Sequence, residues 1–335
     1  MPVIAAMSVS ERFHAVCEGR PVDRLPMVEW ATWWGDTTSR WQQEGLQVSE
    51  RYELYRHFGL DCWRQHWCCA VRWDCPWKAP HHGAGVLAAA PSYDAVEPFV
   101  GAWPVNRAAF ATSFAQQAAG EAAVWATFPG FFWGAREVLG IERHLLSFHD
   151  EPEFLHRIND RLASWMLRFL EELDGLGRLD FITFAEDLSY NHGPMLSKKS
   201  FDTFLLPYYR RVVPELKRRG IRVVIDSDGD ITRCAPWFAA AGIEGILPLE
   251  RQAGVDIDVL QRNHPDMLFI GHYDKMAMPK GEAAMRTEFE RLLPAMRRGR
   301  FIPSVDHQTP PGVSLENYRI YLRLLAEYVE RAVQA

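Results

Sequence analysis

The sequence lacks any long apolar run and any concentration of basic residues. None of its apolar stretches approaches the length that spans a bilayer. Its 43 acidic and 37 basic residues are spread along the chain and leave a net charge of −6, so the basic stripe of a nucleic-acid-binding protein is missing. Residues 1–10 have neither the charged start nor the apolar stretch of a signal peptide. We therefore expect a cytoplasmic protein that binds neither nucleic acid nor membranes.

Cysteine is also scarce. The six cysteines are too few and too irregularly spaced for a disulfide framework in a chain of 335 residues. Only Cys68, Cys69 and Cys75 cluster, and their spacing differs from the CxxC pattern of a structural zinc site. Free thiols in a packed segment are the favoured interpretation.

Short apolar runs alternate with helical patterns along most of the chain. The runs that read as strands are residues 26–30, 60–65, 122–127, 180–185, 221–225, 245–249, 267–270 and 301–305. The helical stretches between the later runs are residues 152–173, 198–219, 232–241, 256–263 and 282–298, and Ser314 is expected to cap a last helix. Strand, helix and strand at this spacing indicate parallel βαβ units. The pattern predicts an α/β fold, a single TIM (β/α)8 barrel over residues 1–335 with an N-terminal extension.

The alternation lapses between residues 76 and 120, where His81-His82-Gly83 and Pro91-Ser92 mark turns. Long connections without clear elements are typically lids or binding loops. We predict that residues 76–120 form an insertion over the barrel mouth.

Several predicted strands end in acidic or histidine residues, which are Glu186, Asp187, Asp226, Asp228, Glu250, Asp306 and His307. Isolated carboxylates are costly to bury, so apolar runs that repeatedly end in them indicate strands that deliver side chains to one polar mouth. Parallel closure of the barrel is expected to bring these strand ends to the same rim, together with those at Trp30 and Tyr273.

Asp226 and Asp228 are two residues apart and face the same side of a strand. They are predicted either to bind a metal ion or to bind substrate as a charged pair. In the alternative, one caps the following helix and the other pairs with Arg233 or Arg251. His307 is the strongest histidine candidate, because imidazole titrates near neutral pH and ligates metals well. In the alternative, His307 has a structural role and forms a hydrogen bond with a loop carbonyl.

Glu186 and Asp187 are adjacent, so only one of them is expected to reach the centre of the mouth while the other holds a loop. Either is a candidate general base, and a structural salt bridge is the alternative. Tyr190 is predicted to donate a hydrogen bond to an anion, unless it only lines the loop wall. Glu186, Asp187, Tyr190 and His307 are the predicted catalytic residues.

The aromatic residues indicate the kind of ligand. The 13 tryptophans concentrate before Trp133, so the N-terminal third is expected to supply an aromatic-lined pocket as well as core. The predicted substrate-binding residues are Trp33, Trp34, Phe132, Trp133, Tyr273 and Lys275. In a rival arrangement, Lys275 pairs with Asp228 or Asp306 and takes the place of a metal.

Three segments, residues 11–26, 186–194 and 220–229, resemble the uroporphyrinogen decarboxylase superfamily, and most closely its branch of corrinoid-linked methyltransferases. The resemblance covers nearly the whole chain. It implies a TIM-type barrel with its site at the carboxyl ends of the strands. It also implies transfer of a methyl group from or to a small O- or N-methyl compound, with a corrinoid protein as partner and a second copy of the chain as a further candidate.

The departures from the family pattern are equally informative. The zinc-dependent methyltransferases carry His-x-Cys where this chain has Asp226-Ser227-Asp228, and a further Cys where it has Asp306-His307. Carboxylates and imidazole suit Mg, Mn, iron, or zinc held by oxygen and nitrogen. We therefore predict a divalent metal at Asp226, Asp228 and His307, with Glu186 as a further ligand or as the base.

Two other functions stay open. Residues 29–36 lack the arginines with which uroporphyrinogen decarboxylase itself holds its polyanionic substrate, so haem synthesis is disfavoured. A metal-assisted decarboxylase or lyase acting on a small aromatic acid is the main alternative. A non-catalytic binding barrel, which would have no metal and a mouth sealed by ion pairs, is the third.

Overall fold

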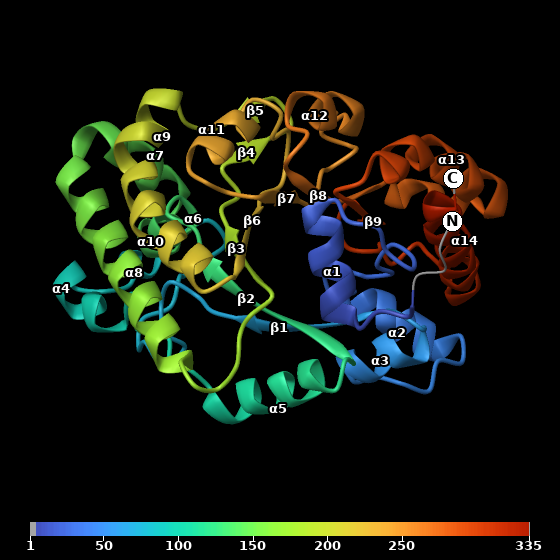
Figure 1. The fold of residues 1–335 in the computed structure, drawn as a ribbon. Helices are drawn as coiled ribbons and strands as arrows, with labels where there is room; N and C mark the ends of the chain where they lie inside the picture. Colours follow the sequence, from blue (N-terminus) through green and yellow to red (C-terminus); the bar gives the residue numbers. More distant parts are fainter. Residues whose placement is uncertain (1–4, 335) are drawn as a thin grey trace.

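The computed structural model describes residues 5–334 and contains one parallel sheet that curls into a barrel (Figure 1). Its strands, in spatial order, are β1 (Cys62–Trp67), β2 (Ala122–Pro129), β3 (Phe181–Ala185), β6 (Arg222–Asp226), β7 (Gly245–Leu247), β8 (Leu268–Tyr273) and β9 (Phe301–Val305). Every neighbouring pair is parallel. The α/β barrel predicted from the alternation of strands and helices is therefore confirmed, and each of these strands overlaps a predicted run.

The run at residues 26–30 is not a strand, which corrects that part of the prediction. It nevertheless bridges the two ends of the sheet. The Asp61 amide, just before β1, donates to the Met27 carbonyl at 2.7 Å, and the Trp30 indole N–H donates to the carbonyl of Val305 in β9 at 2.9 Å. Pro26 has no N–H to give to a ladder, so the segment makes single contacts in place of a regular pairing.

The helices include those predicted from the sequence. They are α1 (Val9–Glu18), α2 (Gly35–Gln43), α3 (Arg51–His57), α4 (Tyr93–Val96), α5 (Arg107–Ala118), α6 (Trp133–Leu139), α7 (Ile141–Asp150), α8 (Pro152–Leu173), α9 (Lys198–Phe204), α10 (Leu206–Arg218), α11 (Ala235–Ala240), α12 (Ile257–Asn263), α13 (Glu282–Arg298) and α14 (Leu315–Val333). Ser314 caps α14 by accepting a hydrogen bond from the Asn317 amide at 3.1 Å. The continuous helix predicted over residues 198–219 is instead broken at Leu205, because Pro207 lacks the N–H that would continue the α9 ladder.

The N-terminal extension is tied to the barrel by buried charge. Ser8 and Glu11 form a capping box at the start of α1. From α1, the Arg12 guanidinium pairs with Asp23 at 2.7 Å and with Asp61 at 3.1 Å. Because Asp61 directly precedes β1, these ion pairs fix the extension against the sheet.

The segment predicted as a mouth insertion contains short helices. Its last helix, α5, follows β1 and packs beside β2, as the helix of a βαβ unit does. Figure 1 shows α5 and the small hairpin of β4 (Ser189–Tyr190) and β5 (Gly193–Pro194) at opposite ends of the barrel. Residues 86–88 contact α6, which begins at the carboxyl end of β2, so only this part lies near the rim. A lid over the mouth stays a prediction.

No helix in the described part of the chain combines the length and the apolar character that crossing a membrane would require.

Candidate active site

Acidic side chains that follow two neighbouring strands, β6 and β7, meet a histidine that follows β9 at the carboxyl end of the sheet. One ligand atom from each of Asp228, Glu250 and His307 lies within 4.8 Å of the other two. The His307 Nε2 to Asp228 Oδ2 distance is 3.5 Å. These residues follow β6, β7 and β9, so parallel register places them on one rim. We call Asp228, Glu250 and His307 the mouth cluster.

A glycine turn holds the mouth cluster in place. The amide of Gly229 donates to Glu250 Oε2 at 2.8 Å, which links the end of β6 to the loop after β7. Gly229 has a φ of +82°, and a Cβ at this position would lie 2.7 Å from the backbone of Tyr190. Glycine is therefore needed both for the left-handed conformation and for the close approach of the β4–β5 hairpin.

Two further carboxylates lie beside the mouth cluster. The amide of Asp228 donates to Asp187 Oδ1 at 3.2 Å. Burial raises the pKa of Asp187 to about 6, and the negative charge of Asp228 adds to the rise. Burial, followed by the charges of Asp187 and Asp228, also raises the pKa of Asp226 well above its usual value. Of the predicted metal ligands, Asp228 and His307 thus lie in the cluster and Asp226 lies next to it.

His307 carries the positive charge of the site. Burial alone would lower its pKa, but the hydrogen bond that His307 donates to Asp228 and the charges of Asp228 and Glu250 outweigh burial and raise the pKa. The Trp30 and Trp34 rings lie 6.2 Å and 6.3 Å from the His307 ring, measured between centroids. The imidazole is thus held between acidic groups and an aromatic wall.

Glu186 lies apart from the mouth cluster. Its carboxylate accepts hydrogen bonds from the amides of Phe131, Phe132 and Trp133, at 2.9, 2.8 and 3.2 Å, and from the Tyr209 hydroxyl. Burial raises its pKa to about 7, although these hydrogen bonds favour the charged form. Of the adjacent pair, Asp187 therefore faces the cluster while Glu186 fixes the start of α6. To act as a metal ligand or a general base, Glu186 would have to lose these hydrogen bonds.

Lys275 is engaged beneath the rim. Its ammonium group donates to Asp306 Oδ1 at 3.1 Å and to Gln252 Oε1 at 2.7 Å. Asp306 Oδ2 accepts from the Arg251 amide at 3.0 Å. The structure therefore contains the predicted alternative in which Lys275 pairs with Asp306. Lys275 does not pair with Asp228.

The predicted aromatic wall is only partly at the mouth. Trp33 is buried against Trp41 and Tyr318, under α2 and α14, because a full indole gains most when both faces leave water. Trp34, the next residue, is 48% exposed and faces the His307 ring. The wall near His307 is therefore built by Trp30 and Trp34.

Phe132 and Trp133, the other two residues of the predicted aromatic wall, also differ in burial. Phe132 is buried against His144 and Phe148 of α7. Trp133 is only partly buried, and its indole N–H donates to Glu137 Oε1 at 2.8 Å. Thus Trp133 stays accessible while Phe132 belongs to the core.

Two other predicted residues have unlike positions. Tyr273 is fully buried and packs on Phe289 and Tyr321, so it faces the outer helices and has no path to a ligand. Tyr190 is 51% exposed on β4, and its carbonyl accepts from the Asp230 amide at 2.9 Å. Its hydroxyl is accessible to a ligand or to a partner.

Sequence reasoning did not assign a role to Glu250 or Arg136. Glu250 lies three residues past β7, and the strand-end rule that selected the other carboxylates also covers it. Arg136 lies on α6, with its guanidinium carbon 4.5 Å from the centre of the Trp133 ring. A helical arginine carries no strand-end signal, so its position could come only from the fold.

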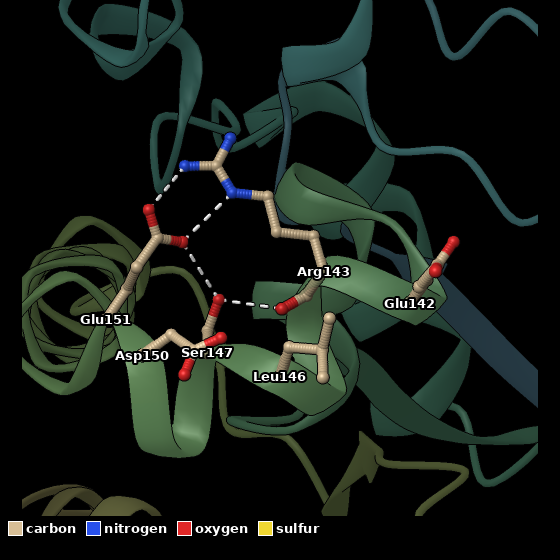
Figure 2. Close-up of a pocket in the computed structure, with 6 residues that line it drawn as sticks. All are labelled: Glu142, Arg143, Leu146, Ser147, Asp150 and Glu151. Atoms are coloured by element: carbon tan, nitrogen blue, oxygen red, sulfur yellow. Dashed lines mark hydrogen bonds and ion pairs between the residues drawn. The ribbon is translucent and has the colours of Figure 1, made fainter.

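Figure 2 shows a surface hollow formed by α7 and the residue that follows it. An ion pair between Arg143 and Glu151, at 2.8 Å, and the hydroxyl of Ser147 occupy its floor. None of the strand-end residues lines it. Its polar groups satisfy one another, and we assign it no chemistry.

Comparison with known proteins supports the fold. The chain has 14% identity and a TM-score of 0.66 to a methyltransferase from Methanosarcina mazei, over 96% of this chain and 99% of that one. Weaker structural matches include fungal beta-1,4-galactanases, with 8% identity and a TM-score of 0.43 over 89% of this chain and 99% of that one. A search of curated protein sequences found no match.

The sequence profile of uroporphyrinogen decarboxylase (URO-D) matches residues 112–328. The matched region runs from within α5 into α14 and includes β2, β3 and β6–β9. It therefore contains every acidic residue of the rim and His307. On this match, the chain belongs to the uroporphyrinogen decarboxylase family.

Proposed function

We propose that the protein is a methyl-transfer enzyme that moves a methyl group between a small O- or N-methyl compound and a corrinoid protein. The observation that carries this proposal is the mouth cluster of Asp228, Glu250 and His307. Two of its members, Asp228 and His307, lie at the strand ends at which the methyltransferases that the sequence resembles carry zinc ligands. The fold similarity to the Methanosarcina mazei methyltransferase supports the same conclusion.

A divalent metal is part of the proposal. The donor set of two carboxylates and one imidazole suits a hard ion, or zinc held by oxygen and nitrogen, and it contains no thiolate. Asp228, Glu250 and His307 would hold the ion, with Asp226 beside them as a further donor. A bound divalent ion would act as a Lewis acid toward the oxygen or nitrogen that carries the methyl group. It would also relieve the repulsion among the rim carboxylates.

The protein's own residues would supply the proton. When a methyl group leaves oxygen or nitrogen, the atom left behind gains negative charge and needs a proton. Asp187 has a pKa of about 6, and the pKa of Asp226 is raised well above its usual value. Burial favours the neutral form of Asp187, so this carboxyl group would carry the proton and act as the general acid, while Asp226 would serve as the metal donor. In methyl transfer to the compound, the same group would take the proton back.

The surface around the mouth fits a protein partner. Among residues 5–334, four of the six large apolar side chains that are exposed lie at or just after segments that end at this rim, and each is between 44% and 51% exposed: Trp34, Trp67, Tyr190 and Met276. Exposed apolar side chains gathered on one face mark interaction surfaces. A corrinoid protein that covers the mouth would bury them and bring its cofactor over the cluster.

A methyl-transfer assay tests this proposal. Purified protein supplied with Mg²⁺, Mn²⁺ or Zn²⁺ is mixed with a small methoxy or methylamino compound and a reduced corrinoid, and methylation of the corrinoid is followed by its absorbance. Asp228→Asn and His307→Ala are expected to lower the rate at least about 100-fold, as expected for loss of a metal ligand set. The matched control is Asp202→Asn, which alters an exposed ion pair with Lys198 on α9. No methylation by wild type with any of the three metals contradicts the proposal.

Decarboxylation of a small aromatic acid is the second candidate function. The raised pKa of Asp187 favours it, since a carbon that loses CO₂ must also gain a proton and a carboxyl group with a raised pKa can supply one. Release of CO₂ from aromatic acids without corrinoid separates the two functions.

The cellular setting is part of the proposal. All six cysteines are free thiols, which a reducing compartment such as the cytoplasm preserves. A homodimer also stays a prediction, and sedimentation of the purified protein would check it.

A further inference from the structure

We infer that Arg136 binds a carboxylate of the substrate, so that the substrate class is a small methylated carboxylic acid. This inference rests on the proposed function, because it names the substrate of the same mouth. The test of the inference measures binding affinity, so its result does not depend on whether the protein transfers methyl groups.

Arg136 is a cation without a partner beside the acidic rim. It lies on α6, whose first amides are held by Glu186 at the end of β3. Its side chain is half-buried, and its guanidinium carbon sits 4.5 Å from the centre of the Trp133 ring. Within residues 5–334, no side chain or carbonyl accepts a hydrogen bond from this guanidinium. The indole ring orients the guanidinium plane but leaves its donors available.

Of the other cations near the rim, Lys275 and Arg251 have hydrogen-bond acceptors. Lys275 donates to Asp306 and Gln252. Arg251 directs its guanidinium to the Val255 carbonyl at 3.2 Å. Burying a charge without a counter-charge is costly, so a structure that leaves Arg136 half-buried and free gains when an anion arrives.

Asp187 is the acid whose charge acts on Arg136, and the two side chains form no ion pair. The charge of Arg136 acts on Asp187, whose carboxylate instead accepts the amide of Asp228. Asp187 therefore connects the surroundings of Arg136 to the mouth cluster, since it responds to the charge of Arg136 and accepts a hydrogen bond from Asp228. A substrate bound with one end at Arg136 would extend its other end past Asp187 toward Asp228 and His307, where the methyl group is handled.

The guanidinium selects the chemistry of the anchored group. Its planar set of donors matches the two oxygens of a carboxylate, and such pairs are charge-assisted and directional. The Trp133 face beneath it and the exposed Trp34 ring near His307 provide apolar surface for the body of a small, flat substrate. A methoxybenzoate has this combination of a carboxylate, a planar body and a methyl ether.

Calorimetric titration tests the inference with a matched pair of probes, 3-methoxybenzoate and its uncharged analogue 3-methoxybenzamide. Wild type is expected to bind the benzoate at least about 10-fold more tightly than the benzamide, the range of a charge-assisted hydrogen bond. Arg136→Gln should remove this preference and leave benzamide affinity unchanged. Arg136→Lys should retain part of it, because the charge remains while the planar donor set is lost.

The controls separate anchoring from folding. Arg143→Gln removes an arginine on neighbouring α7 that pairs with Glu151, and it should leave both affinities unchanged. Thermal melting of each variant checks that α6 is intact. The inference is overturned if wild type shows no preference for the benzoate, or if Arg136→Gln weakens both probes equally. If Arg136→Gln does not fold, Arg136→Lys provides the test. The inference is then overturned if Arg136→Lys prefers the benzoate over the benzamide as strongly as wild type does.

Discussion

The acidic residues of the rim are held close together at a cost in stability. Asp187, Asp226 and Asp228 act on one another through their charges, and burial disfavours the charged form of Asp187 and Asp226. A group whose folded pKa is raised stabilises the fold at low pH and loses that contribution as pH rises through its folded pKa. The rim should therefore oppose folding most strongly above neutral pH when no cation is bound.

The first prediction concerns this pH dependence. With EDTA present, the free energy of unfolding of wild type should fall as pH rises from about 4 to about 7, the window that begins near the usual carboxyl pKa and passes the raised Asp187 value. Asp187→Asn, which stays neutral, should flatten this fall and be more stable than wild type at pH 8 by about 2 kcal/mol. Urea unfolding at several pH values measures it. Parallel curves for both proteins would show that Asp187 titrates normally.

The side chain of Glu186 fixes the position of a whole helix, α6. Three consecutive amides at the start of α6 have this carboxylate as their acceptor, at a point where the helix has no residue of its own to cap it. A Cβ on Gly130 would lie 2.2 Å from the Glu186 side chain, so the preceding turn is also shaped around it. The position of Arg136 on α6 depends on the same contacts.

The second prediction follows from those contacts. Glu186→Ala leaves three buried amide donors without acceptors and should lower the free energy of unfolding by about 3 kcal/mol or more. Glu186→Gln should be intermediate, because the amide oxygen can accept while the amide nitrogen faces other donors. Equilibrium urea denaturation provides the measurement, and Glu171→Ala, at an exposed position of α8, serves as the comparison. A loss below about 1 kcal/mol for Glu186→Ala would contradict this account.

The turn after β6 is decided by backbone conformation. Gly229 and Gly254 both have positive φ, of +82° and +86°, but only Gly229 is crowded, since a Cβ on Gly254 would meet nothing within 4 Å. The two positions therefore form a natural comparison between conformational strain and steric clash.

The third prediction uses that comparison. Gly254→Ala should lower the free energy of unfolding by about 1 kcal/mol, the cost of a left-handed alanine. Gly229→Ala adds a clash with the backbone of Tyr190 and should cost about 3 kcal/mol, and it should weaken metal binding by displacing Glu250. Thermal melting with and without added Mn²⁺ measures both effects. Equal losses for the two variants would mean that the hairpin moves aside freely.

The whole molecule brings donors from distant parts of the chain to one rim. Asp228, Glu250 and His307 follow three different strands, so an ion bound by them would hold the carboxyl ends of β6, β7 and β9 together. An ion that binds only the folded state stabilises it in proportion to the logarithm of its concentration.

The fourth prediction applies this linkage. At a metal concentration about 100 times the dissociation constant, wild type should gain about 2.7 kcal/mol of stability. Asp228→Asn should lose most of this gain, whereas Asp202→Asn, on the exposed face of α9, should keep it. Melting temperatures over a series of Mg²⁺, Mn²⁺ and Zn²⁺ concentrations measure the gain. Identical metal responses of wild type and Asp228→Asn would place the ion elsewhere.

The sequence by itself determined the order of strands and helices and the strand ends that carry acidic residues, because the period of apolar residues and the points where it stops are local properties. Pro207 shows the limit of periodicity, since the helical pattern continues across a residue that cannot donate the next hydrogen bond.

Only the tertiary structure decided which of these residues act together. Glu186 and Asp187 are equivalent in sequence, yet three amides from the turn after β2 hold Glu186 while Asp187 faces the cluster. Trp33 is buried and Trp34 exposed because α2 and α14 cover the first and not the second. The physical reason is the same in each case: hydrogen-bond partners and packing surfaces come from segments far away in the chain, and they are fixed only when the barrel closes.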